Sequence, residues 1–179
     1  VANHPFGGVD ALILIKLFAE VRPDFKAMGN FLIQKIEPIK DLIFPVNPFE
    51  ERKDIKSSFG GIKSSLLHLE EGKSLGIFPA GEVSSYQHDS GIIQDREWQT
   101  SILKFIKKAR VPIVPVYFHG TNSRLFHLLG NIHPVLRTAK LPSELFNKKN
   151  KTVKIRIGNP IPVKEQDEFV DVSHFGRYL

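Results

Sequence analysis

The sequence predicts an α/β fold in which a largely parallel sheet is flanked by helices. Short apolar runs of strand length alternate with segments whose apolar residues recur at helical spacing, and turn residues separate them. Strands that alternate with helices in this rhythm favour parallel pairing. Sites on such sheets collect at the carboxyl ends of the strands, so we look for functional residues directly after each predicted strand.

The first half of the chain follows this alternation. Gly72 and Pro38 end two of the predicted helices, because glycine favours the turn after a helix and proline cannot continue one. The expected elements are a helix at 11–19, a strand at 25–28, a short helix at 31–36, a strand at 42–46, a charged loop at 50–56, a helix at 57–71, a strand at 75–78 and a loop at 79–85.

The second half is less regular. Residues 86–97 show no periodicity, and the apolar run at 111–118 contains two prolines, which indicate an edge strand or an irregular start. The other expected elements are a helix at 98–110, short helices at 125–129, 134–137 and 143–146, a half-buried strand at 152–157 and a turn at 158–160.

Composition narrows the classes of function. The 179 residues, 41% hydrophobic and 25% charged, fit a single domain over 1–179. The sequence has no cysteine, which excludes thiol nucleophiles, and no apolar run near the roughly 20 residues that span a bilayer. Because it opens at Val1 rather than methionine, we expect segments of a longer protein to precede it and leave open whether others follow.

The basic charge favours a polyanionic partner. The net charge is +6 and the pI about 9.5, which suits either nucleic acid or an anionic membrane face. Neither basic cluster, at 104–110 or at 148–156, is interleaved with aromatic residues that could stack on bases. We therefore expect no nucleic-acid partner.

The strongest catalytic candidate is the pair His4 and Asp10. A histidine can take a proton from a hydroxyl near neutral pH, and a carboxylate on its other ring nitrogen fixes the tautomer and stabilises the imidazolium. Gly7 and Gly8 supply the loop between them. The alternative is structural, since Asp10 stands where an N-cap of the following helix would stand.

Three blocks follow one another in a set order: Asn3-His4-Pro5 through Asp10, Phe78-Pro79-Ala80-Gly81-Glu82, and Val111-Pro112-Ile113-Val114-Pro115-Val116. Together they resemble the glycerolipid acyltransferase family, and their order and spacing are more specific than any one of them. The Phe-Pro-Ala-Gly-Glu block and the Asn122–Phe126 stretch are similar to those of the branch that acylates lyso-ornithine and related amino-acid lipids, some of whose members are labelled hemolysins.

The resemblance implies a glycerolipid acyltransferase-like fold and an O-acyltransferase. The acyl group would come from acyl carrier protein or coenzyme A, as co-substrate rather than cofactor, and the acceptor would be a lysolipid. His4 would act as general base and Asp10 would orient it. The resemblance also implies that the protein binds peripherally to an anionic membrane surface, at the cytoplasmic face of the inner membrane. The residues implied to bind substrate are Gly7, Gly8, Pro79, Gly81, Glu82, Ser84 and Arg52.

The sequence departs from the family pattern at two places. Five residues separate His4 from Asp10 where the family has four, so the distance between the two side chains tests the assignment. Ala80, Glu82 and Val83 replace the family's Glu, Thr and Arg, which removes a phosphate-pairing arginine and favours an amino-acid lipid over lysophosphatidic acid. Where the family often carries a second arginine, after an apolar strand, Asn47-Pro48 follow Val46, and Arg52 or Lys53 could substitute from the loop. Glu82 could pair with a substrate amine.

A second class of function stays open. The same fold could bind lipid or an acyl carrier without turnover, because family positions are altered. The other histidines show no ligand spacing with carboxylates, so we expect no metal site. Tight vesicle or carrier binding that is indifferent to substitution of His4 would distinguish the binding protein from the enzyme.

Overall fold

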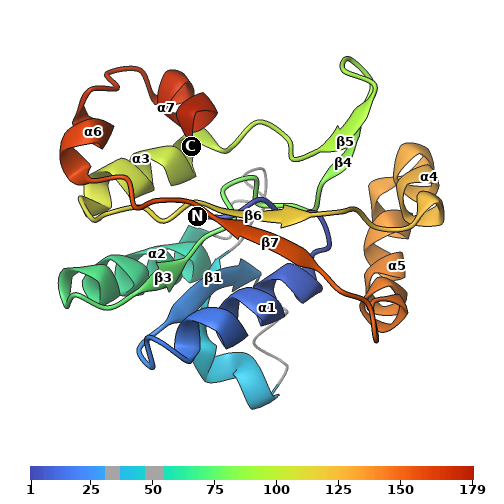
Figure 1. Cartoon of the computed structure of the whole chain (residues 1–179), viewed down its shortest axis with the longest axis horizontal. Helices are drawn as coiled ribbons and strands as arrows, with labels where there is room; N and C mark the ends of the chain where they lie inside the picture. The colour runs from blue at the N-terminus through green and yellow to red at the C-terminus, as the bar shows by residue number, and fades with distance from the viewer. Residues whose placement is uncertain (31–36, 47–54) are drawn as a thin grey trace.

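A small parallel sheet forms the centre of the structure. In this computed structural model, which describes residues 1–30, 37–46 and 55–179, β1 (Lys26–Asn30) lies between β2 (Ile43–Val46) and β3 (Leu75–Gly76). Both neighbours pair with β1 in parallel, with Ala27 opposite Ile43 and Gly76 (Figure 1). The parallel order requires crossover connections, which α2 (Ile55–Glu70) helps to provide.

The first two residues extend the sheet beyond β3. The Ala2 amide donates to the Ile77 carbonyl at 3.0 Å, and the Val116 amide donates to the Val1 carbonyl at 2.8 Å. Val116 opens β6 (Val116–His119), which pairs in antiparallel fashion with β7 (Lys154–Ile157). The site residues that follow Ala2 are therefore held between β3 and β6.

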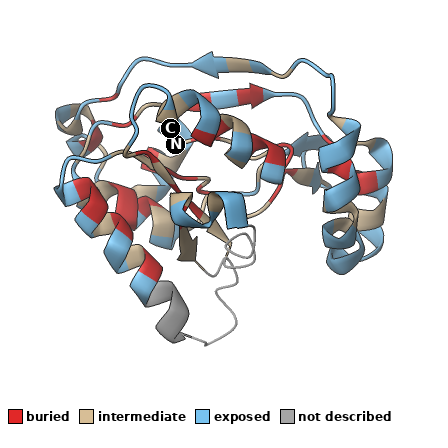
Figure 2. Cartoon of the chain, turned by 90° about the horizontal axis from the view of Figure 1, so that it is seen from below, coloured by how far each residue is buried: buried red, intermediate tan, exposed pale blue. Residues whose placement is uncertain are grey.

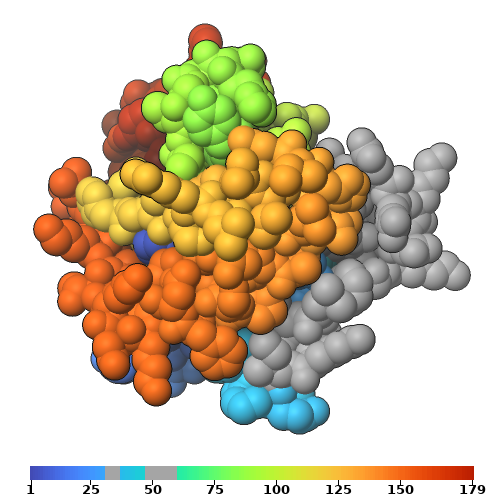
Figure 3. Space-filling view, turned by 90° about the vertical axis from the view of Figure 1, so that its right-hand side faces the viewer, coloured from blue at the N-terminus to red at the C-terminus, as the bar shows by residue number. Residues whose placement is uncertain are grey.

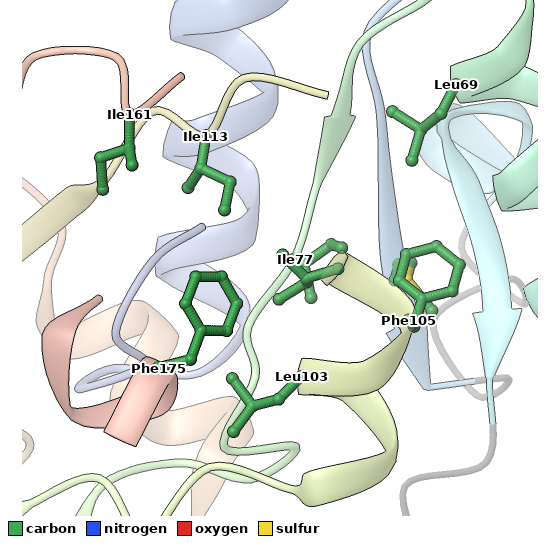
Figure 4. Close-up of a cluster of buried hydrophobic side chains, with 9 residues drawn as sticks. Leu69, Ile77, Leu103, Phe105, Ile113, Ile161 and Phe175 are labelled. Carbon is green, nitrogen blue, oxygen red and sulfur yellow. The ribbon is translucent and has the colours of Figure 1, made fainter. Parts of the chain in front are cut away.

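The sheet separates two apolar cores. Neighbouring residues of β1 point to opposite faces, as the pleat of a strand requires: Ala27 packs with Leu14 and Ile15 of α1 (Gly8–Ala19), whereas Met28 packs in the second core. That second core is closed by α2, α3 (Thr100–Ala109) and α7 (Val172–Tyr178) (Figure 4). The result is helix, sheet and helix in three layers.

Two pairs of elements project from these layers. The hairpin of β4 (Ser85–Gln87) and β5 (Ile92–Gln94) leaves the sheet after β3, and α4 (Arg124–Ile132) and α5 (Pro134–Asn147) follow β6 (Figure 1). The outer sides of α4 and α5 are largely exposed (Figure 2). The remaining elements are the 3₁₀ helix η2 (Glu37–Leu42) and α6 (Val163–Asp167).

Most predicted elements are confirmed with shifted ends. The mixed α/β class, the three parallel strands and the helices at 57–71 and 98–110 are present within a few residues, and α1 begins at Gly8, three residues before the expected start. The short helix expected at 31–36 and most of the charged loop expected at 50–56 lie outside the described residues. No helix among the described residues is long and apolar enough to cross a membrane.

Three predictions are corrected. The strand expected at 111–118 begins only at Val116, because Pro112 and Pro115 have no amide hydrogen for a ladder. The helices expected at 134–137 and 143–146 are one helix, α5, which contains Pro142. The stretch 86–97 contains part of β4 and all of β5, since strands of three residues are too short to show periodicity.

Candidate active site

The His4 and Asp10 side chains lie together at the edge of the sheet. Nδ1 of His4 is 3.2 Å from Oδ2 of Asp10, and the carboxylate is fully buried while the imidazole is 17% exposed. The two groups are close but not aligned as a hydrogen bond, because Nδ1 of His4 and Oδ1 of Asp10 have no hydrogen-bond partner in the described chain. The 3.2 Å separation is within hydrogen-bonding distance, so the pair needs a change in ring orientation rather than in distance to direct Nδ1–H at the carboxylate.

The loop between the two residues owes its shape to Gly7. Its φ of +82° lies in the left-handed region that favours glycine, and an added Cβ would lie 3.0 Å from Val83 Cγ2. Gly7 is the N-cap of α1, so Asp10 is the third residue of the helix rather than its N-cap. This turn accommodates five residues between histidine and aspartate.

Asp10 combines a structural role with its place beside the imidazole, although the structural role is not the N-cap that the sequence offered as the alternative. Its Oδ2 accepts hydrogen bonds from the amides of Phe6 at 2.8 Å and Gly7 at 2.9 Å. These bonds satisfy donors ahead of the helix and fix the carboxylate beside His4. The structural role and the pairing with the imidazole therefore belong to the same oxygen.

Contacts with β6 on one side and with Phe78 on the other hold His4 in place. The Asn3 amide group donates to the Phe118 carbonyl at 3.0 Å and accepts from the Phe118 amide at 2.7 Å, which ties the segment to β6. The His4 ring lies over Phe78, with 4.2 Å between ring centroids. The imidazole is thus placed between β6 and the loop that follows β3.

The loop at 78–84 brings several predicted residues to the pair. Pro79 is buried, and its carbonyl accepts from the Gln99 amide at 3.1 Å. Gly81 has φ +71°, and an added Cβ would lie 2.2 Å from Gln99 Nε2. The Ser84 amide donates to the His4 carbonyl at 2.9 Å, so this loop is bonded directly to the segment that carries His4.

Asp95 is a site residue that sequence reasoning missed. Its carboxylate accepts from the His4 amide at 3.1 and 3.2 Å and from the Ser84 hydroxyl. Burial raises the pKa of the Asp95 carboxyl, although the bonds from Ser84 and His4 act in the opposite direction. Asp95 positions the His4 backbone from the end of the β4–β5 hairpin, a place that no local pattern marks.

Glu82 lies between two arginines. Oε1 is 3.0 Å from Arg96 and Oε2 is 3.0 Å from Arg137 on α5. Both carboxylate oxygens are therefore engaged by this chain, and the expectation that Glu82 pairs with a substrate amine stays a prediction. Neither arginine is marked by local sequence as a partner of Glu82, because the contacts join distant segments.

One stripe of α5 covers the turn between His4 and Asp10. Its members are spaced by four, three and four residues, so they share a helix face. Leu141 lies against Gly7, and Lys148, at the end of the helix, lies 5.1 Å from the centre of the Phe6 ring. The stripe consists of Arg137, Leu141, Glu144 and Lys148.

Glu144 is the anchor of this stripe. It is fully buried and accepts from the Ser123 amide and hydroxyl, Asn147 and Lys148. Burial by itself would raise the pKa of Glu144, but these hydrogen bonds outweigh it and lower the pKa to about 2. The ionised form therefore stabilises the docking of α5 beside the site.

Replacing Glu144 with glutamine is expected to weaken the fold at neutral pH and to reduce its acid sensitivity. A carboxylate with a lowered pKa contributes stability above its ordinary pKa of 4.5 and loses that contribution as pH falls toward 2. The loss at pH 6 should be about 3 kcal/mol, since one partner of a buried pair is removed. Thermal unfolding from pH 6 to pH 3 measures both effects.

Glu37→Gln is the matched control, because its carboxylate is 79% exposed in a surface pair with Lys40. It should change the melting temperature little at any pH. Equal acid sensitivity of Glu144→Gln and the unmodified chain would contradict the assignment.

Backbone amides near His4 and Asp10 differ in whether they already donate a hydrogen bond within the chain. The Gly7 amide donates to Asp10 and the Gly81 amide donates to the Phe78 carbonyl at 3.0 Å. Gly8 is exposed at the start of α1, where the first amides of a helix have no carbonyl within the helix to bond. Arg52 lies outside the described residues. Within the described residues, no cluster of three metal-ligating side chains is present.

Comparisons of the sequence with known proteins find matches in one family. A profile described as Acyltransferase matches residues 1–173. A lyso-glycine lipid O-acyltransferase of Bacteroides thetaiotaomicron is 31% identical over 189 residues, and one of Phocaeicola vulgatus is 30% identical over 188 residues. Each alignment covers the whole chain, which spans 66% and 64% of the length of these relatives.

Proposed function

This chain belongs to the acyltransferase family, and from that premise we propose that it transfers a fatty acyl group from a thioester to the free hydroxyl of a lysolipid. The observation that carries the proposal is the 3.2 Å separation of His4 Nδ1 and the buried Asp10 Oδ2. A partly exposed imidazole next to a buried carboxylate is the arrangement that general-base chemistry on a hydroxyl requires. We extend the proposal to a glycerolipid acyltransferase-type fold.

The proposed reaction uses His4 as base and then as acid. With the Nδ1 proton toward Asp10, Nε2 takes the proton of the acceptor hydroxyl while its oxygen attacks the thioester carbonyl carbon. The carbon–sulfur bond of the tetrahedral intermediate then breaks, and the imidazolium returns the proton to the leaving thiolate. The products are an ester and a free thiol, and the positive charge that the ring carries between the two proton transfers faces Asp10.

The intermediate carries an oxyanion that needs donors. We assign this role to the first amides of α1, beginning with Gly8, because the Gly7 and Gly81 amides already have acceptors. The positive end of the helix dipole adds to their effect. The same helix therefore holds the carboxylate partner of the base and faces the developing negative charge.

The acceptor we propose is an amino-acid lysolipid, as the names of the two relatives suggest. The test incubates the purified chain with acyl carrier protein or coenzyme A thioesters and with lyso-glycine lipid, lyso-ornithine lipid or lysophosphatidic acid. We expect ester formation with an amino-acid lysolipid and slower transfer to lysophosphatidic acid. Failure of every donor and acceptor pair, with lipid binding intact, would favour the non-catalytic binding protein instead.

We propose that the protein acts at an anionic membrane surface, and one face of the structure supports this proposal. The β4–β5 hairpin, α4 and α5 lie side by side on one face (Figure 3). That face exposes large apolar side chains, and Arg124, Lys149 and Lys151 are exposed near it. Apolar residues beside cations suit an anionic bilayer. The most exposed apolar residues of the face are Phe146, Ile132, Val135, Leu128, Ile92 and Leu125.

Replacing Phe146 with glutamate is expected to weaken binding to anionic vesicles about tenfold or more, because a buried phenylalanine contributes about 1.5–3 kcal/mol. Phe146 is 74% exposed on α5. Val170, 94% exposed near α7, offers the control Val170→Glu, which should bind as the unmodified chain does. Sedimentation with phosphatidylglycerol vesicles measures both, and equal losses in the two variants would exclude α5 as the contact.

A further inference from the structure

Two hollows adjoin each other on the face formed by the β4–β5 hairpin and α4. One has a volume of about 510 Å³ and is lined mainly by apolar side chains, including Ile93, Leu125 and Leu128. The other has a volume of about 270 Å³ and holds Glu82, Arg96 and Arg137. They share Tyr86, His127 and Asn131, so one elongated molecule with an apolar and a polar end could occupy both.

Arg137 is fixed at the polar end. Its side chain is 14% exposed and is held by Glu82 Oε2 at 3.0 Å. The stem lies on Gly130, where an added Cβ would be 3.0 Å from Arg137 Cδ, and the guanidinium lies 6.0 Å from the centre of the Phe126 ring. A guanidinium held in this way loses little freedom when it binds an anion.

The polar hollow has one uncompensated positive charge. Arg96 and Arg137 share the single carboxylate of Glu82, and each guanidinium has five N–H donors of which Glu82 engages only some. Burial and the nearby Arg137 lower the pKa of His127, so His127 adds no charge at neutral pH. Nδ1 of His127 is buried in the hollow wall with no hydrogen-bond partner in the described chain.

The polar hollow is close to the base. Glu82 is two residues from Ser84, a span of at most about 7 Å between Cα atoms. The Ser84 amide bonds to the His4 carbonyl at 2.9 Å. A headgroup in the hollow therefore lies within the length of a short lipid from the imidazole.

We propose that the polar hollow binds the free carboxylate of an amino-acid headgroup, with Arg137 as the main contact and Arg96 as the second, while the single acyl chain lies in the apolar hollow. A planar carboxylate matches the paired donors of a guanidinium. This inference rests on the proposed function only for the statement that the bound lipid is the acceptor. It assigns recognition to arginines outside the family-like blocks.

The test measures equilibrium binding, which needs no turnover. The probes are N-decanoyl glycine, its methyl ester and decanoic acid, titrated calorimetrically into the whole chain. We expect N-decanoyl glycine to bind at least about tenfold more tightly than the ester, and Arg137→Gln to remove that preference, as loss of a charge-assisted pair predicts. Arg96→Gln, at a 67% exposed arginine, should have a smaller effect in the same direction.

Arg110→Gln is the matched control, because Arg110 forms a similar ion pair with Asp167 on α6, outside the two hollows. It should bind all three probes as the unmodified chain does. Equal binding of acid and ester, or equal binding of decanoic acid and N-decanoyl glycine, would overturn the inference. Loss of acyl transfer with the acid preference intact would instead contradict the proposed function, so the two failures are distinguishable.

Discussion

Acyl transfer is expected to fall about a thousandfold or more when His4 is replaced with alanine, because a general base contributes 10²- to 10⁴-fold. The variant keeps Asp10 and its bonds to the Phe6 and Gly7 amides, so α1 should still begin at the same residue. The measurement is initial rate of ester formation at saturating thioester and lysolipid, with circular dichroism to confirm the fold.

The matched control for this substitution is His174→Ala, at an exposed histidine on α7. Its rate should equal that of the unmodified chain. Transfer retained by His4→Ala would sink the proposed mechanism. The binding-protein alternative predicts that both variants bind lipid equally and that neither substitution matters.

Substitution of Asp10 is expected to have the second large effect on the transfer rate. Two substitutions separate the effect of its charge from that of its hydrogen bonds. Asp10→Asn keeps an oxygen for the Phe6 and Gly7 amides but removes the negative charge beside His4. We expect it to lower the transfer rate about a hundredfold or more, because the ring loses both its counter-charge and the acceptor that fixes its tautomer. The melting temperature should fall modestly.

Asp10→Ala should lower both quantities. The two buried amides lose their acceptor, at about 1–3 kcal/mol for each donor left unsatisfied, so stability should fall well below that of Asp10→Asn. Rates and melting temperatures of both variants, measured in parallel, test the division. Equal rates in Asp10→Asn and the unmodified chain would show that the charge is not used.

The pairing of His4 with Asp10 could be predicted from local sequence, and the reason is physical. The two residues stand on either side of one short turn at the start of α1, and glycine at position 7 permits the φ of +82° that closes it. The loop after β3 was likewise predictable as a site, because it leaves a strand at its carboxyl end. The unusual spacing was the open question, and the 3.2 Å separation answers it.

The surroundings of the pair were not predictable in the same way. Asp95 lies in a stretch without periodicity. It contributes to the site by accepting a hydrogen bond from the His4 amide, 91 residues away along the chain. Arg137 was placed in a short predicted helix, with nothing local to indicate that it would reach Glu82. Contacts of this kind depend on how distant elements dock, which periodicity and turn signals do not encode.

The docking of α5 onto the turn between His4 and Asp10 has a consequence for the order in which this region assembles during synthesis. His4 and Asp10 are synthesised before their partners, because Asn3 bonds to Phe118, 115 residues further along the chain, and Glu144 bonds to Ser123 from α5 itself. A contact across as long a stretch as that between Asn3 and Phe118 carries a large cost in loop-closure entropy. A nascent chain that ends before α5 therefore carries both side chains without the helix that covers the turn between them.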